Sequence, residues 1–259
     1  MRILEGLGVN CITVPIQQSI EPLLTYYLPS WLPPGLTIHS VTETPDNNIN
    51  VATGPNSWKV AIILKELAIP YETKLLDYSV LHDKPFTDIN PNGRSLHDPN
   101  TNITLWESCA INEYLIDKHD AEHKLTHTTS PGKYLEKQYL YFQASGQGPY
   151  YGQAAWFNSF HPEPVPSAKE RYGNETRRII SVLDGILADR KYLVGEKITY
   201  ADLAFVTWDH FVDWCVAPNS WDINAYPNFK RWHEEMMARP SVVEALEERD
   251  AGTINAGVH

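Results

Sequence analysis

The chain has 259 residues, of which 42% are hydrophobic and 20% are charged, and its formal net charge is −11 at pH 7. This composition is that of an ordinary globular protein with one large domain or two small ones. The negative charge argues against nucleic acid and anionic membrane surfaces as partners, because their phosphates would repel the protein. No apolar stretch approaches the length of a membrane span, so we expect none.

Cysteine and histidine usage argues against disulfides and against a metal site. The three cysteines, Cys11, Cys109 and Cys215, lie far apart, and an odd, sparse set favours a reducing compartment. The ten histidines are scattered, without the spacing typical of metal ligands. We therefore expect a cytoplasmic protein that holds no metal.

Residues 1–34 form an N-terminal extension of unknown role. Its apolar stretches are interrupted by polar residues such as Glu5, Asn10 and Glu21, whereas a signal peptide has a continuous apolar segment. The extension has three equally good explanations: a functional segment, an appended segment without function, or a wrongly chosen start codon.

Residues 35–120 have the pattern of a thioredoxin-like α/β domain. Strand composition and helical spacing of apolar residues alternate along this part of the chain. The expected elements are a strand over 35–41, a helix from 54–57 to Ile69, a strand over 71–76, a strand over 103–106 and a helix over 107–118. The helical crossover makes the first two strands parallel.

Residues 119–130 are polar and are expected to link this domain to an all-helical one over residues 131–250. Ile179, Val182, Leu183, Ile186 and Leu187 predict one buried helical stripe. Thr199 to Asp202 has the pattern of a capping box. The helix that follows, expected over residues 203–216, is apolar nearly all round and should be buried. A last helix is expected from Tyr226 to Arg239.

Glu107 and Ser108 are candidate binding residues because they open a helix directly after a strand. Backbone N–H groups at a helix N-terminus attract anions, and Ser108 adds a hydroxyl that can hold a carboxylate. Glu107 offers a carboxylate to an ammonium group. The pair therefore suits an α-amino-acid headgroup. The alternative is that Ser108 only caps the helix while Glu107 complements its dipole.

Asn56 stands at the start of the first predicted helix and has two interpretations. Asn is a preferred N-cap, which bonds the helix through its side-chain oxygen. Alternatively, its amide N–H donates to a bound thiolate. A free thiol has a pKa near 8.5, and a helix N-terminus with one donor lowers it by about one to two units, which converts a minor ionised fraction into the majority.

Four segments resemble the fungal glutathione transferases related to the yeast nitrogen-catabolite prion protein. They are residues 54–60 (GPNSWKV), 90–94 (NPNGR), 106–108 (WES) and 142–150 (FQASGQGPY). The resemblance runs from about Pro55 to Leu246 and implies the glutathione transferase fold, a thioredoxin-like domain followed by an all-α domain. It also implies glutathione as cosubstrate and a homodimer.

The resemblance assigns glutathione contacts to Asn56, His82, Arg94, Glu107 and Ser108, with Asn56 beside the sulfur. The chain departs from the family pattern after Arg94. Ser95 and Leu96 stand where the family has a Val-Pro pair with a cis bond, and a cis bond without proline costs about 2.5–4 kcal/mol. We expect Ser95 and Leu96 to contact glutathione without copying that turn.

The implied activity is addition of the glutathione thiolate to an apolar electrophile, such as a fungal secondary metabolite. The outcome is either conjugation or cis–trans isomerisation by addition, rotation and release. Aromatic side chains of the helical half are candidates for the second-substrate site, namely Tyr150, Tyr151, Trp156 and Trp208. The alternative is a non-catalytic binding or regulatory protein with the same fold, which the missing Val-Pro favours.

Overall fold

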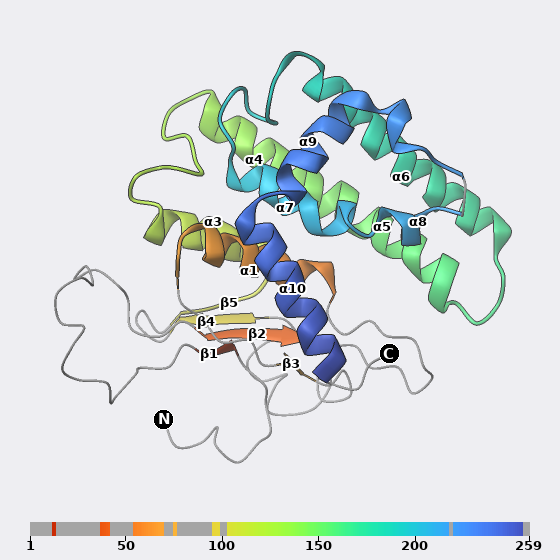
Figure 1. Cartoon of the computed structure of the whole chain (residues 1–259), viewed down its shortest axis with the longest axis horizontal. Helices are drawn as coiled ribbons and strands as arrows, with labels where there is room; N and C mark the ends of the chain where they lie inside the picture. Colours follow the sequence, from red (N-terminus) through yellow and green to blue (C-terminus); the bar gives the residue numbers. More distant parts are fainter. Residues whose placement is uncertain are drawn as a thin grey trace. The chain divides into compact units, whose positions relative to one another are not determined.

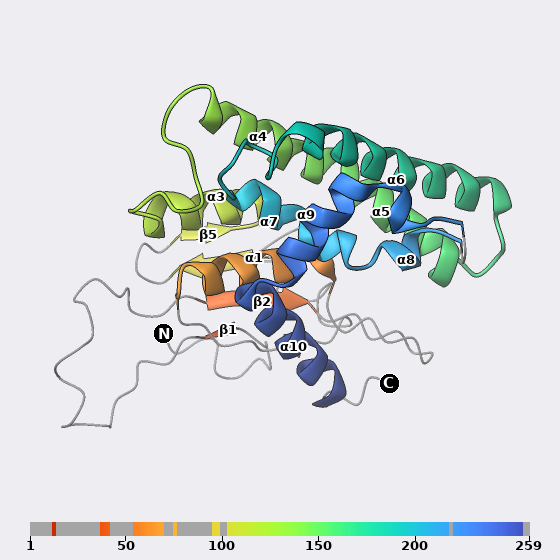
Figure 2. The same ribbon diagram turned by 45° about the horizontal axis from the view of Figure 1, so that its top comes forward.

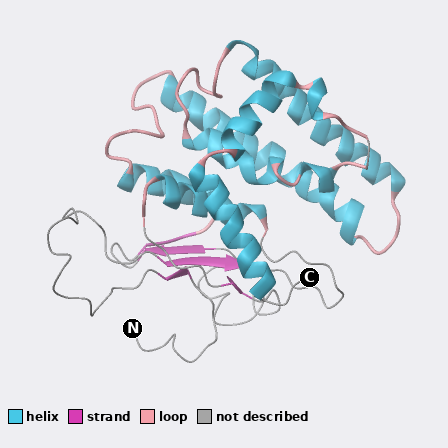
Figure 3. Ribbon diagram, in the orientation of Figure 1, coloured by secondary structure: helices cyan, strands magenta, loops and turns pink. Residues whose placement is uncertain are grey.

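The computed structural model describes residues 12–13, 37–41, 54–69, 75–76, 95–98, 103–217 and 220–255. The chain divides into two compact units, Met1–Ile111 with Glu244–His259 (unit 1) and Asn112–Val243 (unit 2). The described strands lie in unit 1, and the described part of unit 2 is helical (Figure 3). The predicted combination of a thioredoxin-like α/β half with an all-α half is thereby confirmed. The division differs from the predicted limits, 35–120 and 131–250, which stay a prediction.

The sheet of unit 1 is built around strand β2 (Thr37–Val41). Strand β3 (Leu75–Leu76) pairs with it in parallel, with Ser40 opposite Leu75, as the predicted β-α-β unit requires. Strand β4 (Ser95–Asp98) is antiparallel to β2 and to β5 (Ile103–Leu105). Residues of the N-terminal extension add a short strand, β1 (Ile12–Thr13), antiparallel to β2, so the extension contributes to the sheet.

Helix α1 (Pro55–Glu66) connects β2 to β3 in the chain, as predicted. Its residues from Trp58 to Leu64 are all buried, so the helix is enclosed on every side rather than on the one face expected. Lys65 near its end forms ion pairs with Glu244 at 3.8 Å and Glu248 at 3.1 Å. These pairs fasten α1 to α10 (Pro240–Asn255), the last helix of the chain.

Helix α3 (Ser108–His119) follows β5 directly. The spacing of Ala110, Ile111, Tyr114 and Leu115 predicts one apolar face, of which Ile111 and Leu115 are buried whereas Ala110 is exposed. Cys109 and Ile116 are buried instead, because the buried face is rotated toward these two residues.

The described part of unit 2 contains α-helices, π-helical turns and two short 3-10 helices, η4 (Leu187–Asp189) and η5 (Ile223–Ala225). Its α-helices are α4 (Gly132–Phe142), α5 (Gly148–Ala155), α6 (Pro166–Ile186), α7 (Tyr200–Asp209), α8 (Val212–Cys215) and α9 (Pro227–Met237). Two π-helical turns, η2 (Gln143–Gln147) and η3 (Trp156–Phe160), flank α5. Such turns are rare and often mark functional segments. The long helix α6 packs along α5, as the views in Figures 1 and 2 agree.

Two helical expectations need correction. In the predicted stripe of α6, Ile179, Leu183 and Leu187 are buried, but Val182 is 36% exposed. The single helix expected over residues 203–216 is interrupted: α7 ends at Asp209 and α8 begins at Val212. The Phe211 N–H donates to the Trp208 carbonyl, three residues back, at 3.0 Å. This bond tightens the last turn and ends the helix.

The predicted capping box of α7 is confirmed. Asp202 Oδ2 accepts hydrogen bonds from the backbone N–H and the hydroxyl of Thr199, both at 2.9 Å. Its Oδ1 accepts from the Leu193 N–H at 2.9 Å and the Trp232 indole N–H at 3.0 Å. Burial raises the pKa of Asp202, and these four hydrogen bonds oppose that rise. Asp202 therefore joins three segments of unit 2 at one buried point.

Candidate functional site

Glu107 has an unusual backbone conformation at the junction of β5 and α3. Its φ is 71°, in the left-handed region, which costs roughly 1–2 kcal/mol for a residue with a side chain. Its carbonyl accepts the Ile111 N–H at 2.9 Å, and its side chain is exposed. Such strain is often found at ligand sites, and here it accompanies a carboxylate that solvent and ligands can reach.

Ser108 is the first residue of α3 and is half-buried. Because Glu107 occupies the position before the helix and accepts its first hydrogen bond, the interpretation of Ser108 as the N-cap is wrong. Glu107 and Ser108 stand together at the helix start, where the first N–H groups lack helical acceptors.

Asn56 also lies inside its helix rather than at the cap. Gly54 is the N-cap of α1, with φ −61° and ψ 149°, and Pro55 is the first helical residue. Asn56 follows in the first turn and is half-buried. The interpretation of Asn56 as an N-cap is therefore wrong. Gly54 has no side chain with which to cap α1, and the first turn, Pro55 to Ser57, contains no acid, so no acid of this turn neutralises the positive end of the helix dipole.

Four other predicted glutathione contacts are described only in part or not at all. His82 and Arg94 lie outside the described residues. Ser95 and Leu96 begin β4, where they stand opposite His39 and Ile38 of β2, and their side chains lie outside the description. Their predicted role in binding stays a prediction.

The four aromatic candidates of unit 2 differ in burial. Trp156 is 48% exposed and stacks on Phe160, with ring centroids 6.2 Å apart. Tyr150 and Trp208 are half-buried, whereas Tyr151 is fully buried. Tyr151 is thus a core residue, and the surface roles of Tyr150, Trp156 and Trp208 stay predictions.

A buried polar cluster lies behind these aromatics and was not foreseen from the sequence. Asp209 Oδ1 accepts from the Gln147 amide at 2.7 Å and from the Tyr151 hydroxyl at 3.3 Å. Its Oδ2 has no partner among the described residues. Burial without a cation raises the pKa of Asp209 well above its usual range. Burial thus favours the protonated form of Asp209.

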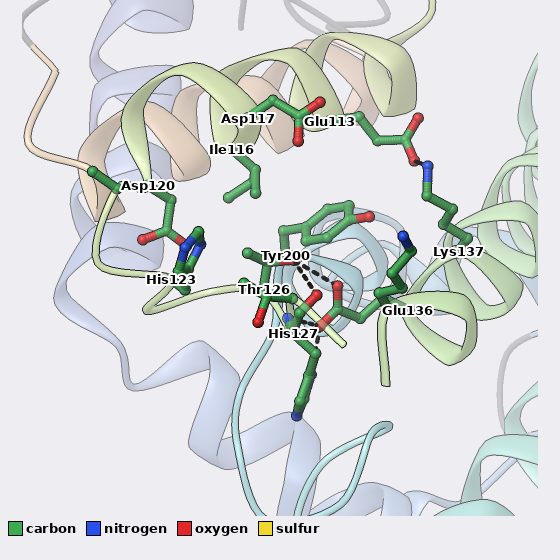
Figure 4. A pocket seen from close by; sticks show the side chains of 13 residues that line it. Glu113, Ile116, Asp117, Asp120, His123, Thr126, His127, Glu136, Lys137 and Tyr200 are labelled. Carbon is green, nitrogen blue, oxygen red and sulfur yellow. Dashed lines mark hydrogen bonds and ion pairs between the residues drawn. The ribbon is translucent and has the colours of Figure 1, made fainter. Parts of the chain in front are cut away.

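A charged cavity of about 450 Å³ also lies in unit 2 (Figure 4). The Glu136 carboxylate points at Thr126 and His127, and its oxygens accept from the Thr126 hydroxyl at 2.8 Å and the His127 N–H at 2.5 Å. Asp120 accepts from the N–H groups of Lys124 and Leu125 at 2.7 and 2.8 Å. These acids bind the chain's own backbone and so fasten the predicted linker, residues 119–130. None of the predicted site residues lines this cavity.

The described residues also bear on metal binding and on membrane insertion. Across those residues, no group of three His, Cys, Asp or Glu side chains is arranged to hold a metal ion. Among the described helices, none combines the length and apolar character that crossing a bilayer requires.

Comparison with known sequences identifies both halves of the chain. The profile of the family described as "Glutathione S-transferase, N-terminal domain" matches residues 53–118. The profile described as "Glutathione S-transferase, C-terminal domain" matches residues 149–240. The matches include the junction at Glu107 and the aromatic segment around Tyr150.

Individual relatives agree with these profiles. The glutathione S-transferase-like protein gedE of Aspergillus terreus is 45% identical over 206 residues, 74% of this chain and 91% of the relative. The solved structure of the glutathione transferase URE2P6 from Phanerochaete chrysosporium with oxidized glutathione is 42% identical, with a TM-score of 0.72 over 77% of this chain and 93% of that one. Ure2p5 from the same fungus, cocrystallized with 1-(S-glutathionyl)-2,4-dinitrobenzene, is 37% identical, with a TM-score of 0.68 over 78% and 93%.

Proposed function

The chain belongs to the glutathione S-transferase family, among the fungal members of the Ure2p class, and on this premise we propose that it adds the thiolate of bound glutathione to an apolar electrophilic small molecule. The observation that carries the proposal is the strained, exposed Glu107 before α3, in the same unit as the uncapped first turn of α1. Together they offer a carboxylate for an ammonium group and a helix N-terminus for an anion.

The amino-acid end of glutathione is assigned to the start of α3. The exposed Glu107 carboxylate pairs with the ligand's ammonium group, and charge-assisted bonds of this kind are the strong ones. The hydroxyl of Ser108 and the first N–H groups of α3 donate hydrogen bonds to the ligand's carboxylate. This assignment explains why a residue other than glycine is kept at φ 71°.

The sulfur of glutathione is assigned to the first turn of α1. The positive end of the helix dipole lowers a thiol's pKa, and no acid in Pro55 to Ser57 cancels that effect. Asn56 adds an amide N–H donor. Neither described cysteine competes as a nucleophile, because Cys109 and Cys215 are both buried, and burial raises the pKa of the Cys215 thiol.

The second substrate is proposed to be a fungal secondary metabolite, with Tyr150, Trp156 and Trp208 as its wall. In conjugation, the thiolate forms a carbon–sulfur bond and a leaving group departs. In isomerisation, the thiolate adds to a conjugated alkene, the resulting single bond rotates, and the thiolate leaves again. One thiolate site serves both reactions, since each begins with the same thiolate.

A non-catalytic binding or regulatory protein is the second candidate function. It is favoured by Ser95 and Leu96, which stand where the family resemblance places Val-Pro. The two functions predict opposite results in one experiment. A catalytic protein is retained on immobilised glutathione and conjugates 1-chloro-2,4-dinitrobenzene, whereas a regulatory one shows no turnover above the uncatalysed rate. We further propose a homodimer, as the resemblance implies, and light scattering on the purified protein tests it.

A further inference from the structure

A chain of buried hydrogen bonds joins the π-helical turn η2 to helix α7. Gln147 of η2 accepts a hydrogen bond from the Gln143 amide at 3.0 Å. Its own amide nitrogen donates to the Phe205 carbonyl at 3.3 Å and to Oδ1 of Asp209 at 2.7 Å. Because a backbone carbonyl can only accept, the contact with Phe205 fixes which way the Gln147 amide points. Oδ1 of Asp209 is therefore an acceptor.

The surroundings of Asp209 contain other acids. Tyr151 of α5 donates to the same Oδ1 at 3.3 Å, and the Cys215 thiol of α8 donates to the Tyr151 carbonyl at 3.4 Å. Asp213, an exposed acid of α8, acts electrostatically on Cys215. His210, the next residue in the chain, is exposed. No described Lys, Arg or His is paired with Asp209, so no cation offsets a negative charge there.

The two oxygens of the Asp209 carboxyl group are unequally satisfied. The residue is 1% exposed, and Oδ2 has no partner within the described part of the chain, whereas Oδ1 has two. A buried carboxylate without a cation is much less favourable than one in water. A proton on Oδ2 removes the charge and leaves both hydrogen bonds to Oδ1 in place. Burial accordingly raises the pKa of Asp209 well above its usual range.

We propose that Asp209 keeps its proton in the folded chain and is a pH-sensitive joint between η2 and α7, which opens as the proton is lost. The protonated side chain fits the dry site between the two elements. The ionised side chain needs water at Oδ2, and water reaches this buried atom only when η2 and α7 move apart. The joint should therefore be closed at low pH and should loosen as the pH rises.

Asp209→Asn tests the proton, because asparagine has the shape of the protonated acid but does not titrate. The unfolding equilibrium constant of the wild type, divided by that of the variant, is measured by urea denaturation between about pH 4.5 and about pH 7.5. The unfolded wild type loses the proton above its ordinary pKa of 3.8, whereas the folded wild type holds it. The ratio should therefore rise by up to about tenfold per pH unit and level off once the folded acid ionises. The contribution of His233 cancels in the ratio.

Cys215→Ala is the matched control within the same cluster. It removes a buried acid that makes no hydrogen bond to Asp209. Burial raises the pKa of the Cys215 thiol above its ordinary value of 9.0, so the thiol does not titrate in the range of the experiment. The ratio of the wild type to Cys215→Ala should not change with pH.

Amide hydrogen exchange locates the opening. Wild type and Asp209→Asn are compared at the same pH, which cancels the intrinsic pH dependence of exchange. The backbone N–H groups of η2 should exchange equally in both proteins at the lower end of the range and faster in the wild type at the upper end. Those of α9 should exchange equally throughout.

If Asp209→Asn does not fold, the carboxyl-carbon NMR resonance of Asp209 in the wild type carries the test, and its midpoint should lie well above 3.8. A midpoint at 3.8 would overturn the proposal, as would a ratio for folded Asp209→Asn that does not change with pH. A ratio that changes equally in Cys215→Ala would assign the titration to the thiol. A changing ratio without faster exchange in η2 would show that the proton does not act on the joint, which also contradicts the proposal.

Discussion

The N-termini of α7 and α1 solve the same physical problem in opposite ways. Every helix begins with N–H groups that lack helical acceptors and carry a partial positive charge. At α7, Thr199 and Asp202 occupy this end, and the Asp202 carboxylate is fully buried in four hydrogen bonds. At α1, the chain enters through Gly54 and Pro55, without a capping side chain and without an acid in the first turn.

The difference separates a helix that supports the fold from one that is suited to a ligand. An uncapped N-terminus gives up about 1 kcal/mol of stability relative to one with a good cap. At α1 this loss is accompanied by a helix end whose charge is available to an anion. At α7 the same partial positive charge is neutralised by the Asp202 carboxylate of the protein itself. The predictions that follow test this contrast, from the largest expected effect to the smallest.

Asp202→Ala should have the largest effect on stability. Four buried donors would lose their acceptor, so we expect the free energy of unfolding to fall by about 3–5 kcal/mol. Thr199→Ala should cost only about 1 kcal/mol, because the other bonds to Asp202 remain. Urea denaturation measures both. Glutathione affinity per folded molecule should not change in either variant, and a selective loss of affinity with normal stability would contradict the supporting role of this helix end.

His233 should make the helical unit sensitive to acid. Burial lowers its pKa to about 4 from an ordinary value of 6.5, so the unfolded chain binds the proton more readily. The stability from the neutral imidazole is complete above pH 6.5 and is lost as the pH falls from 6.5 toward 4. The loss reaches at most about 3 kcal/mol.

The variant His233→Gln removes this titration and serves as the control. The difference in unfolding free energy between wild type and variant should be constant above pH 6.5 and should shrink below it. A difference that does not vary between pH 7 and pH 4 would show that His233 keeps an ordinary pKa.

Glu107 should favour glutathione binding at a cost to stability. Glu107→Ala should weaken glutathione binding by about 1.5–3 kcal/mol, through loss of a charge-assisted hydrogen bond and an unpaired ligand ammonium. Glu107→Gly should weaken binding equally while raising stability by about 1 kcal/mol, because glycine adopts φ 71° without strain. Calorimetric titration and thermal melting measure the two effects. An unchanged affinity in both variants would remove Glu107 from the site.

Much of this arrangement was predictable because it depends on local pattern. The β-α-β unit, α1, the start of α3 and the Thr199–Asp202 box all follow from periodicity and capping chemistry over a few neighbouring residues. The Asp209 cluster was not predictable, because its partner Gln147 is 62 residues away in the chain and an aspartate after an apolar helix resembles a solvent-exposed end. The exposure of Val182 and the break after Asp209 likewise depend on tertiary packing.

The interpretations of Asn56 and Ser108 as N-caps were wrong because the true cap positions lie one or two residues earlier in the chain. Both residues are of a type that caps helices. However, α3 begins at Ser108 itself, and α1 begins at Pro55, one residue before Asn56, so neither residue stands in the cap position before its helix. Sequence patterns place helix ends only to within a few residues. The role of such a residue depends on that placement, which the structure supplies.

The most direct test of the account is the ionisation of bound glutathione in Asn56→Asp. In the first turn of α1, an aspartate complements the helix dipole and should raise stability by about 0.5 kcal/mol. The same charge, placed beside the sulfur, should raise the pKa of the bound thiol by at least about one unit and slow turnover by about tenfold. The pH dependence of thiolate absorbance, measured with thermal melting, reports both. We predict a more stable protein whose bound thiol ionises at higher pH; a thiol titration identical to that of the wild type would contradict the claim that the uncapped start of α1 activates glutathione.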